Sequence, residues 1–200
     1  MVHSKLCRIT LLAILSACIL LPTNRAGAFD SAQIQLAVDT ANTSQDGLLT
    51  LYGGVRLGGE LGLPVASGDM NHDGHGDVAF CEMYATSGVG TRPNNGQVDI
   101  YMSDGSDSGV VDAGTNPSSI STLIGRSAGD LLGTSVAMGD VNGDGFSDLV
   151  VSATGSDGPN GTRTNCGAVY VVPGSAGFNL HADLGATGGT PPNGISVIYG

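Results

Sequence analysis

The chain has 200 residues, of which 33 are glycine and none is tryptophan, and it carries 18 acidic side chains against seven lysines and arginines. Such acidity argues against nucleic acid or an anionic membrane as a partner and favours cation binding. The many glycines indicate a chain rich in turns with a modest aromatic core.

The N-terminal segment, 1–28, has the pattern of a signal peptide. Two basic residues precede an apolar run over residues 9–21, and residues 26–28 fit a small-x-small cleavage site. A lipobox ending at Cys18 is an alternative that would leave a lipidated N-terminus. The apolar run is shorter than the ~20 residues that span a bilayer, so we expect no membrane insertion after cleavage. Both readings predict a secreted or cell-surface protein.

Cleavage would leave four arginines, no lysine and all 18 acids, a net charge of about −14. The remaining ~170 residues are enough for one domain. Cys81 and Cys166 would be the remaining cysteines, and in an exported protein they form either one disulfide or two small, partly buried thiols. No Cys-x-x-Cys metal or redox motif is present.

The chain contains an internal duplication. The stretch from Gly68 to Asp77 matches the stretch from Gly139 to Asp148 without a gap, and Gly90-Thr91-Arg92 matches Gly161-Thr162-Arg163 in the same register. The unit to explain is therefore one repeat of about 71 residues.

Each repeat contains four short apolar segments bounded by Gly, Asn, Asp and Pro, and these predict strands. The predicted strands are 64–67, 78–81, 97–102 and 121–124 in the first repeat, and 135–138, 149–153, 168–172 and 196–199 in the second. Long polar loops are expected at 82–95 and 103–119 and at the corresponding positions of the second repeat. Four antiparallel strands per repeat are typical of a propeller blade, so we expect an all-β fold.

A further strand over 48–52 resembles the fourth strand of each repeat and would complete the last blade of a closed ring. The expected organisation is a signal peptide (1–28), a lead-in (29–47), a first blade with the preceding closing strand (48–125) and a second blade (126–200). Two blades are fewer than the four to eight of a ring. We therefore expect either an N-terminal fragment of a ring of six or seven blades or a truncated gene product.

Each repeat places oxygen-bearing side chains at positions 1, 3, 5 and 9 of a loop with glycine at position 6. Ca²⁺ takes about six to eight oxygen ligands, and three carboxylates nearly neutralise it. The carbonyl of residue 7 would add a ligand. The candidate ligands, for about one Ca²⁺ per loop, are Asp69, Asn71, Asp73, His75 (carbonyl) and Asp77 in the first loop, and Asp140, Asn142, Asp144, Phe146 (carbonyl) and Asp148 in the second.

Calcium loops flanked by helices fit these residues poorly. An EF-hand needs a bidentate Glu at position 12, where these loops have Phe80 and Val151. Dockerin modules resemble the text "DVNGDG" but expect a following helix, whereas the residues after Asp77 and Asp148 are strand-like. We therefore place both loops in β-hairpins.

The repeats resemble the FG-GAP repeats of the integrin alpha-chain β-propeller type. "GDLLGTSVAMGDVNGDGFSDLVVSA" and "GAVYVVPG" carry the resemblance in the second repeat, and "GELGLPVASGDMNHDGHGDVAF" and "GQVDIYMSDG" carry a looser one in the first. The "FG" and "GAP" positions depart from the pattern, but the metal ligands do not. The family includes adhesion receptors, secreted bacterial proteins and an extracellular phospholipase with a separate catalytic domain, so integrin function does not follow from the fold.

Several weaker signals have simpler explanations. Residues 125–129 match the G-x-S-x-G text, but they link two strands and not the strand and helix of a nucleophile elbow. His72 and His75 are expected to be exposed loop residues and not zinc ligands. Arg92 and Arg163 recur at one position and are expected to anchor their loops to nearby carboxylates. Asp99 is expected to face solvent.

These observations predict a secreted or cell-surface, calcium-binding FG-GAP β-propeller module for protein binding or adhesion, with no catalytic residues and an unidentified protein or glycan ligand. One alternative is the propeller portion of an extracellular hydrolase or lyase whose catalytic residues lie outside this chain. Another is a purely structural calcium repeat.

Overall fold

A computed structural model of the chain describes residues 33–35, 49–53, 61–62, 64–87, 92–106, 109–115, 117–186, 191–192 and 194–200. The expected signal peptide and most of the expected lead-in lie outside these residues. The described residues form strands and one short 3-10 helix, η1 (Ala113–Thr115), so the fold is all-β. They contain no helix long and apolar enough to cross a membrane.

Two four-stranded antiparallel units follow each other along the chain, and each is consistent with a propeller blade. The first unit consists of β3 (Val65–Gly68), β4 (Asp77–Glu82), β5 (Gln97–Tyr101) and β7 (Ile120–Ile124). The second unit consists of β8 (Leu132–Gly139), β9 (Asp148–Ala153), β10 (Ala168–Val172) and β12 (Ser196–Tyr199). All eight predicted strands are confirmed, with ends that differ by a few residues at most.

Two short strands, which we call arm strands, leave their own unit and join the preceding sheet. β11 (His181–Asp183) lies between β10 and β12 in sequence, yet it pairs in parallel with β7 of the first unit. β6 (Gly109–Asp112) lies between β5 and β7, yet it pairs in parallel with β2 (Leu49–Tyr52). The segments predicted as polar loops at 103–119 and at the corresponding positions of the second unit therefore contain strands.

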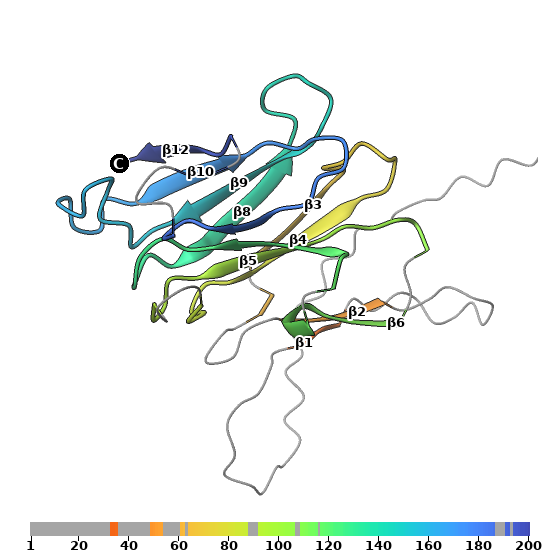
Figure 1. The fold of residues 1–200 in the computed structure, drawn as a ribbon, viewed down its shortest axis with the longest axis horizontal. Helices are drawn as coiled ribbons and strands as arrows, with labels where there is room; N and C mark the ends of the chain where they lie inside the picture. The colour runs from red at the N-terminus through yellow and green to blue at the C-terminus, as the bar shows by residue number, and fades with distance from the viewer. Residues whose placement is uncertain are drawn as a thin grey trace, which may run out of the picture.

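The strand predicted at 48–52 is present as β2, in a three-stranded lead sheet with β6 and with β1 (Gln33–Gln35). Figure 1 shows this sheet on one side of the first unit and the second unit on the other side. β2 pairs in parallel with β6 of the first unit, just as β7 pairs in parallel with β11 of the second unit. β2 therefore corresponds to the fourth strand of a unit, and the first unit is the one that follows it.

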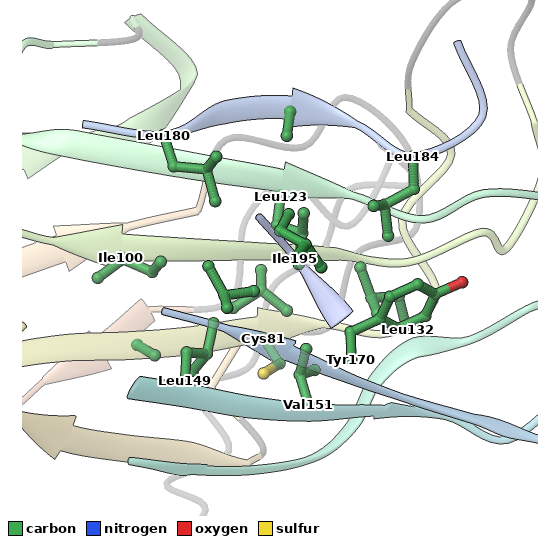
Figure 2. Close-up of a cluster of buried hydrophobic side chains, with 14 of the residues drawn as sticks. Cys81, Ile100, Leu123, Leu132, Leu149, Val151, Tyr170, Leu180, Leu184 and Ile195 are labelled. Atoms are coloured by element: carbon green, nitrogen blue, oxygen red, sulfur yellow. The ribbon is translucent and has the colours of Figure 1, made fainter. Parts of the chain in front are cut away.

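The main core lies between the facing sheets of the two units (Figure 2). The first unit contributes Cys81, Val98, Ile100 and Leu123, each with no exposed surface. The second unit contributes residues of the opposite sheet, including Leu149, Val151 and Tyr170, and its arm contributes Leu180, Ala182 and Leu184. A smaller core joins the other face of the first unit to the lead sheet through Leu51, Leu61, Phe80, Tyr101, Ala113 and Ile120.

Backbone contacts hold the start of the second unit against the end of the long loop of the first unit. The amides of Leu131 and Leu132 donate to the carbonyls of Asn94 and Asn95 at 3.1 and 3.0 Å. Gly96 has a φ of 80°, and a Cβ on it would lie 2.1 Å from the Leu132 carbonyl oxygen. The close approach of the two units at this point therefore requires glycine.

The two cysteines of the expected mature chain are free thiols. Cys81 is buried in the main core and Cys166 is partly exposed, in agreement with the second of the two expected arrangements. Burial raises the pKa of the Cys81 thiol to about 12, and the nearby carboxylates of Asp99 and Glu82 act in the same direction.

Two equivalent side chains provide a test of the core between the units. Leu123 and Ile198 pair with equivalent residues, Val98 and Val169, but Leu123 is fully buried while Ile198 is 63% exposed. We expect Leu123→Ala to lower the free energy of unfolding by about 2–5 kcal/mol because it opens a cavity. Ile198→Ala should change it by less than about 0.5 kcal/mol. Urea unfolding of both variants measures the difference, and equal losses would contradict this core.

Thiol labelling tests the burial of Cys81. At pH 8 the native chain should react with iodoacetamide at Cys166, while the peptide that contains Cys81 stays unlabelled, because its thiol is both buried and protonated. Mass mapping after digestion measures each site. In guanidinium chloride both peptides should be labelled, which controls for detection. Equal labelling of both thiols in the native chain would show that Cys81 is accessible.

Candidate functional site

Each candidate loop joins the first two strands of its unit. Residues 69–76 connect β3 with β4 and residues 140–147 connect β8 with β9, and both strand pairs are antiparallel. The prediction that these loops belong to hairpins is therefore confirmed. Gly74 and Gly145 at position 6 have φ values of 88° and 91°, and a Cβ on either residue would meet no atom within 4 Å. Glycine is favoured there by backbone conformation and not by lack of room.

The carboxylate at position 1 accepts hydrogen bonds from amides across its own loop. Asp69 accepts from the amides of Asp73 at 3.1 Å and Gly74 at 2.9 Å. Asp140 accepts from the equivalent amides of Asp144 and Gly145 at 3.2 and 3.0 Å, and from Gly143 at 2.7 Å. The two loops thus fold around their first carboxylate in the same way.

The side chains at positions 3 and 5 contact each other in both loops. The amide nitrogens of Asn71 and Asn142 donate to Asp73 and Asp144, both at 2.8 Å. Their side-chain oxygens accept from the backbone amides of the same aspartates, at 3.2 and 2.8 Å. Hydrogen bonds therefore link positions 1, 3 and 5 to one another on the exposed side of each loop.

The aspartate at position 9 lies at the base of the hairpin and is buried. The two oxygens of Asp77 accept from the amides of Met70 at 2.8 Å and Ser103 at 3.0 Å. Asp148 accepts in the same way from Val141 at 3.1 Å and Gly174 at 2.9 Å. Each residue ties its loop to the chain that follows the third strand, a structural role that the sequence reasoning did not include.

The residues at position 7 have exposed or half-buried side chains. The amides of His75 and Phe146 donate to the position-5 aspartates, Asp73 and Asp144, at 2.8 and 3.0 Å. The Phe146 ring contacts the ring of His72 in the other loop, with centroids 5.7 Å apart. His72 and His75 are both exposed loop residues, as expected.

Hydrogen bonds and burial shift the pKa values of these carboxyls in opposite directions. The amide of His75 and the side chain of Asn71 lower the pKa of Asp73, and the amides of Gly145 and Gly143 lower that of Asp140. Burial raises the pKa of Asp77, although the amides of Met70 and Ser103 oppose this shift. The lowered pKa values of Asp73 and Asp140 therefore favour the ionised form that a cation requires.

The donor set suits a hard cation, although the side chains are not arranged as a complete coordination sphere. Within the described parts of the chain, no three His, Cys, Asp or Glu side chains are grouped closely enough to hold a metal ion. The oxygens at positions 1, 3, 5 and 9 are carboxylates and carboxamides, which are the ligand types that Ca²⁺ and Mg²⁺ prefer. The loops therefore offer the ligand types that such an ion prefers, while the described side chains do not form a metal site.

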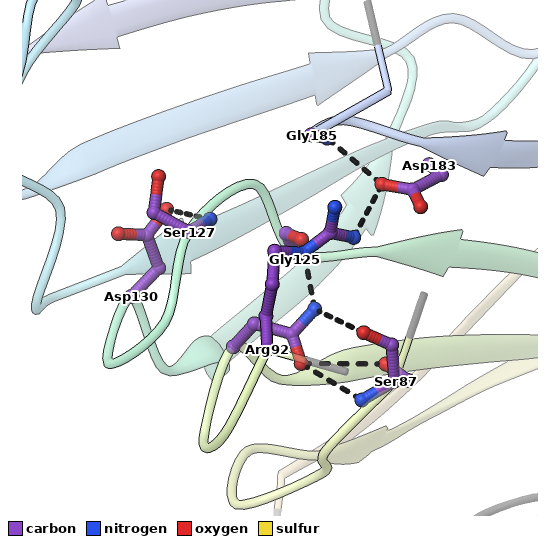
Figure 3. Close-up of polar contacts among 8 residues, drawn as sticks. Ser87, Arg92, Gly125, Ser127, Asp130, Asp183 and Gly185 are labelled. Atoms are coloured by element: carbon purple, nitrogen blue, oxygen red, sulfur yellow. Dashed lines mark hydrogen bonds and ion pairs between the residues drawn. The ribbon is translucent and has the colours of Figure 1, made fainter. Parts of the chain in front are cut away.

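The recurring arginines have different partners. Arg92 forms a largely buried ion pair with Asp183 on the arm of the second unit, and the same Asp183 carboxylate accepts from the Gly185 amide at 2.8 Å (Figure 3). Arg163 donates instead to the Gly200 carbonyl and lies over the Tyr199 ring. The expected carboxylate partner is therefore present for Arg92, but it belongs to the next unit.

The sequence reasoning missed Asp183 as a partner, although a signal for it was present. Asp112 and Asp183 occupy the same position in the two repeats, and each is followed two residues later by a glycine whose amide donates to it at 2.8 Å. The expectation that Asp99 faces solvent is wrong. Its carboxylate is buried and accepts from Thr122 at 2.8 Å and from Gln97 at 3.0 and 3.1 Å, because it faces the core beside the lead sheet.

Comparison with protein families places the second loop within a known repeat. Residues 132–172 match the FG-GAP repeat. The match covers β8, the second candidate loop, β9 and β10 of the second unit. A comparison with curated proteins finds none that matches the chain. The FG-GAP match therefore concerns the second unit.

Substitution at position 9 should separate structural from exposed carboxylates. We expect Asp148→Ala to lower the free energy of unfolding by about 1–3 kcal/mol in the presence of chelator, because the buried amide of Gly174 loses its acceptor. Asp140→Ala should cost clearly less stability, since water can replace an exposed carboxylate. Urea unfolding compares the two variants. A larger loss for Asp140→Ala would contradict the structural role assigned to position 9.

Proposed function

We propose that this chain is a secreted or cell-surface FG-GAP module that binds calcium through its two hairpin loops and serves in protein or glycan binding or in adhesion, without catalysis of its own. The observation that carries the calcium proposal is the repeated network of positions 1, 3 and 5. The loops lie at the same place in the two repeats and share the same oxygen donors and nearly the same hydrogen bonds.

The chemistry of the exposed side of each loop supports a divalent cation. In the second loop, Asp140, Asn142 and Asp144 would offer side-chain oxygens, with the carbonyl of Phe146 and the carboxylate of Asp148 as further ligands. The first loop would use Asp69, Asn71, Asp73, His75 and Asp77 in the same roles. Calcium would supply positive charge where three carboxylates per loop otherwise repel one another.

The position-9 carboxylates can hold the base of the hairpin and at the same time act as calcium ligands. Each oxygen of Asp77 and Asp148 accepts one amide hydrogen bond, and a carboxylate oxygen has a second lone pair for another partner. A cation bound above the loop would therefore connect the exposed ligands to the buried base of the hairpin. Calcium would stabilise the connection between the first two strands of each unit.

The binding role and the extracellular location rest on sequence. The pattern of residues 1–28 supports export, and the net charge of about −14 after cleavage, with no lysine, supports a partner other than nucleic acid. The alternative of a propeller attached to an extracellular hydrolase or lyase receives no particular support from the described residues, so we retain the binding module.

Thermal unfolding with and without calcium tests the proposal. Binding to the native state alone stabilises it by about 2.7 kcal/mol per site when the free ligand is at 100 times its Kd. Calcium should therefore raise the Tm of the chelator-treated chain. The double variant Asp73→Ala/Asp144→Ala should lose most of this shift, and calorimetry on each single variant should show one remaining site.

Asp157→Ala is the matched control. Asp157 is an exposed aspartate outside both loops, and its carboxylate accepts a backbone amide at 2.8 Å, as that of Asp73 does. This variant should retain the full calcium shift. A Tm that does not change on addition of calcium would refute the calcium proposal, and an equal loss in Asp157→Ala would show that the effect comes from general charge.

A further inference from the structure

The arm strands make the same contact twice along the chain. Tyr52 of β2 pairs with Asp112 of β6, and Ile124 of β7 pairs with Asp183 of β11, both in parallel register. In each pair the aspartate ends the arm strand and accepts the amide of the glycine two residues later. The fourth strand of one unit is thus an edge that accepts an arm from the next unit.

The contact at β7 shows which groups hold an arm. The Thr122 amide donates to the Leu180 carbonyl at 2.6 Å, and the Leu184 amide donates to the Ile124 carbonyl at 3.0 Å. The Ser121 hydroxyl accepts the Leu180 amide at 3.0 Å. Arg92 completes the contact through its ion pair with Asp183 (Figure 3).

The outer edge of β12 has the same groups. Register with β10 makes Ser196, Val197 and Tyr199 the equivalents of Ser121, Thr122 and Ile124. β12 pairs with β10 along one edge, and no strand pairs with its other edge in the part of the chain that the structure describes. The backbone groups of alternate residues, including the Val197 amide, face that edge.

Burial differs sharply between the equivalent positions of the two units. Leu123 and Met70 of the first unit have no exposed surface, whereas their equivalents Ile198 and Val141 are 63% and 58% exposed. Leu51 of β2, which has an arm beside it, is only 8% exposed. The positions that are open in the second unit are therefore those that an arm and its unit cover in the first.

Arg163 places a positive charge beside β12, as Arg92 does beside β7. It is equivalent to Arg92, lies 5.9 Å from the centroid of the Tyr199 ring and donates to the Gly200 carbonyl. Among the described residues it forms no ion pair. An aspartate at the end of an arm on β12 would lie beside Tyr199, where this guanidinium is located.

We propose that the outer edge of β12, together with Arg163, is a docking site for a parallel arm strand that ends in aspartate, supplied by a third repeat unit. The two arms of this chain, "GVVD" and "HAD", define its chemistry: a small or aliphatic residue directly before an aspartate and, two residues after the aspartate, a glycine. A second copy of the chain meets this description less well, because both of its arms are already paired.

A labelled peptide with the sequence of residues 178–186 can serve as the probe, added to the full chain. We expect it to bind, and we expect the Asp183→Asn form of the peptide and the Arg163→Met form of the chain each to bind about tenfold more weakly. Such a loss is usual for a charge-assisted hydrogen bond. Equal binding to the native chain and to Arg163→Met would overturn the proposal, as would no binding.

Val197→Pro tests the strand pairing itself. Proline removes only an amide on the outer edge, which an edge strand tolerates, so β12 should stay paired with β10 while peptide binding is lost. Val197→Ala is the matched control, since it shortens the side chain and keeps the amide; it should still bind. The Tm of each variant, measured without peptide, shows that the chain remains folded.

Hydrogen exchange locates the bound peptide. Protection should rise at residues 196–199 and stay unchanged at 120–124. Protection at 120–124 instead would mean that the peptide displaces the chain's own arm. A dimer that is seen in sedimentation and is unaffected by Arg163→Met would mean that a second copy covers the edge. Either result would contradict the proposal. Chelator in all samples keeps these outcomes separate from the calcium proposal.

Discussion

The parallel pairing of β11 with β7 is the contact on which the arrangement of the two units depends. It carries Leu180, Ala182 and Leu184 from the second unit into the core that faces Leu123. A sheet edge has unpaired amides and carbonyls, and an added strand both satisfies them and extends the apolar face. The ion pair of Arg92 with Asp183 fixes the register of this strand, because it joins the last residue of the arm to the long loop beside β7.

The candidate loops depend on the same interface. The Ser147 amide of the second loop donates to the Asp69 carbonyl of the first at 2.9 Å, and Phe146 contacts His72. Ser175, just beyond the third strand of the second unit, donates to the Met70 carbonyl at 2.9 Å. The two loops are therefore neighbours along one end of the stacked sheets, and the position of each is set partly by the other unit.

The sequence predicts local features well, but it does not predict the arm strands. The eight unit strands follow from short apolar runs between turn residues, and the hairpin loops follow from Asp69 to Asp77 and their repeats. β6 and β11 have only four and three residues, and they are strands because the edges of β2 and β7 are available, which no local pattern contains. Asp99 was misplaced for a related reason: its burial depends on Thr122 and Gln97, partners set by the fold.

The pairing of each arm strand with the preceding sheet also sets an order for folding. The outer edge of β7 stays unpaired until residues 181–183 have been synthesised, and Leu123 stays uncovered until the second unit folds against it. During translation the first unit would therefore expose an apolar face and an open edge, the features that lead nascent β proteins to associate wrongly. The first unit thus acts as the template on which the second folds, and its own completion waits for that second unit.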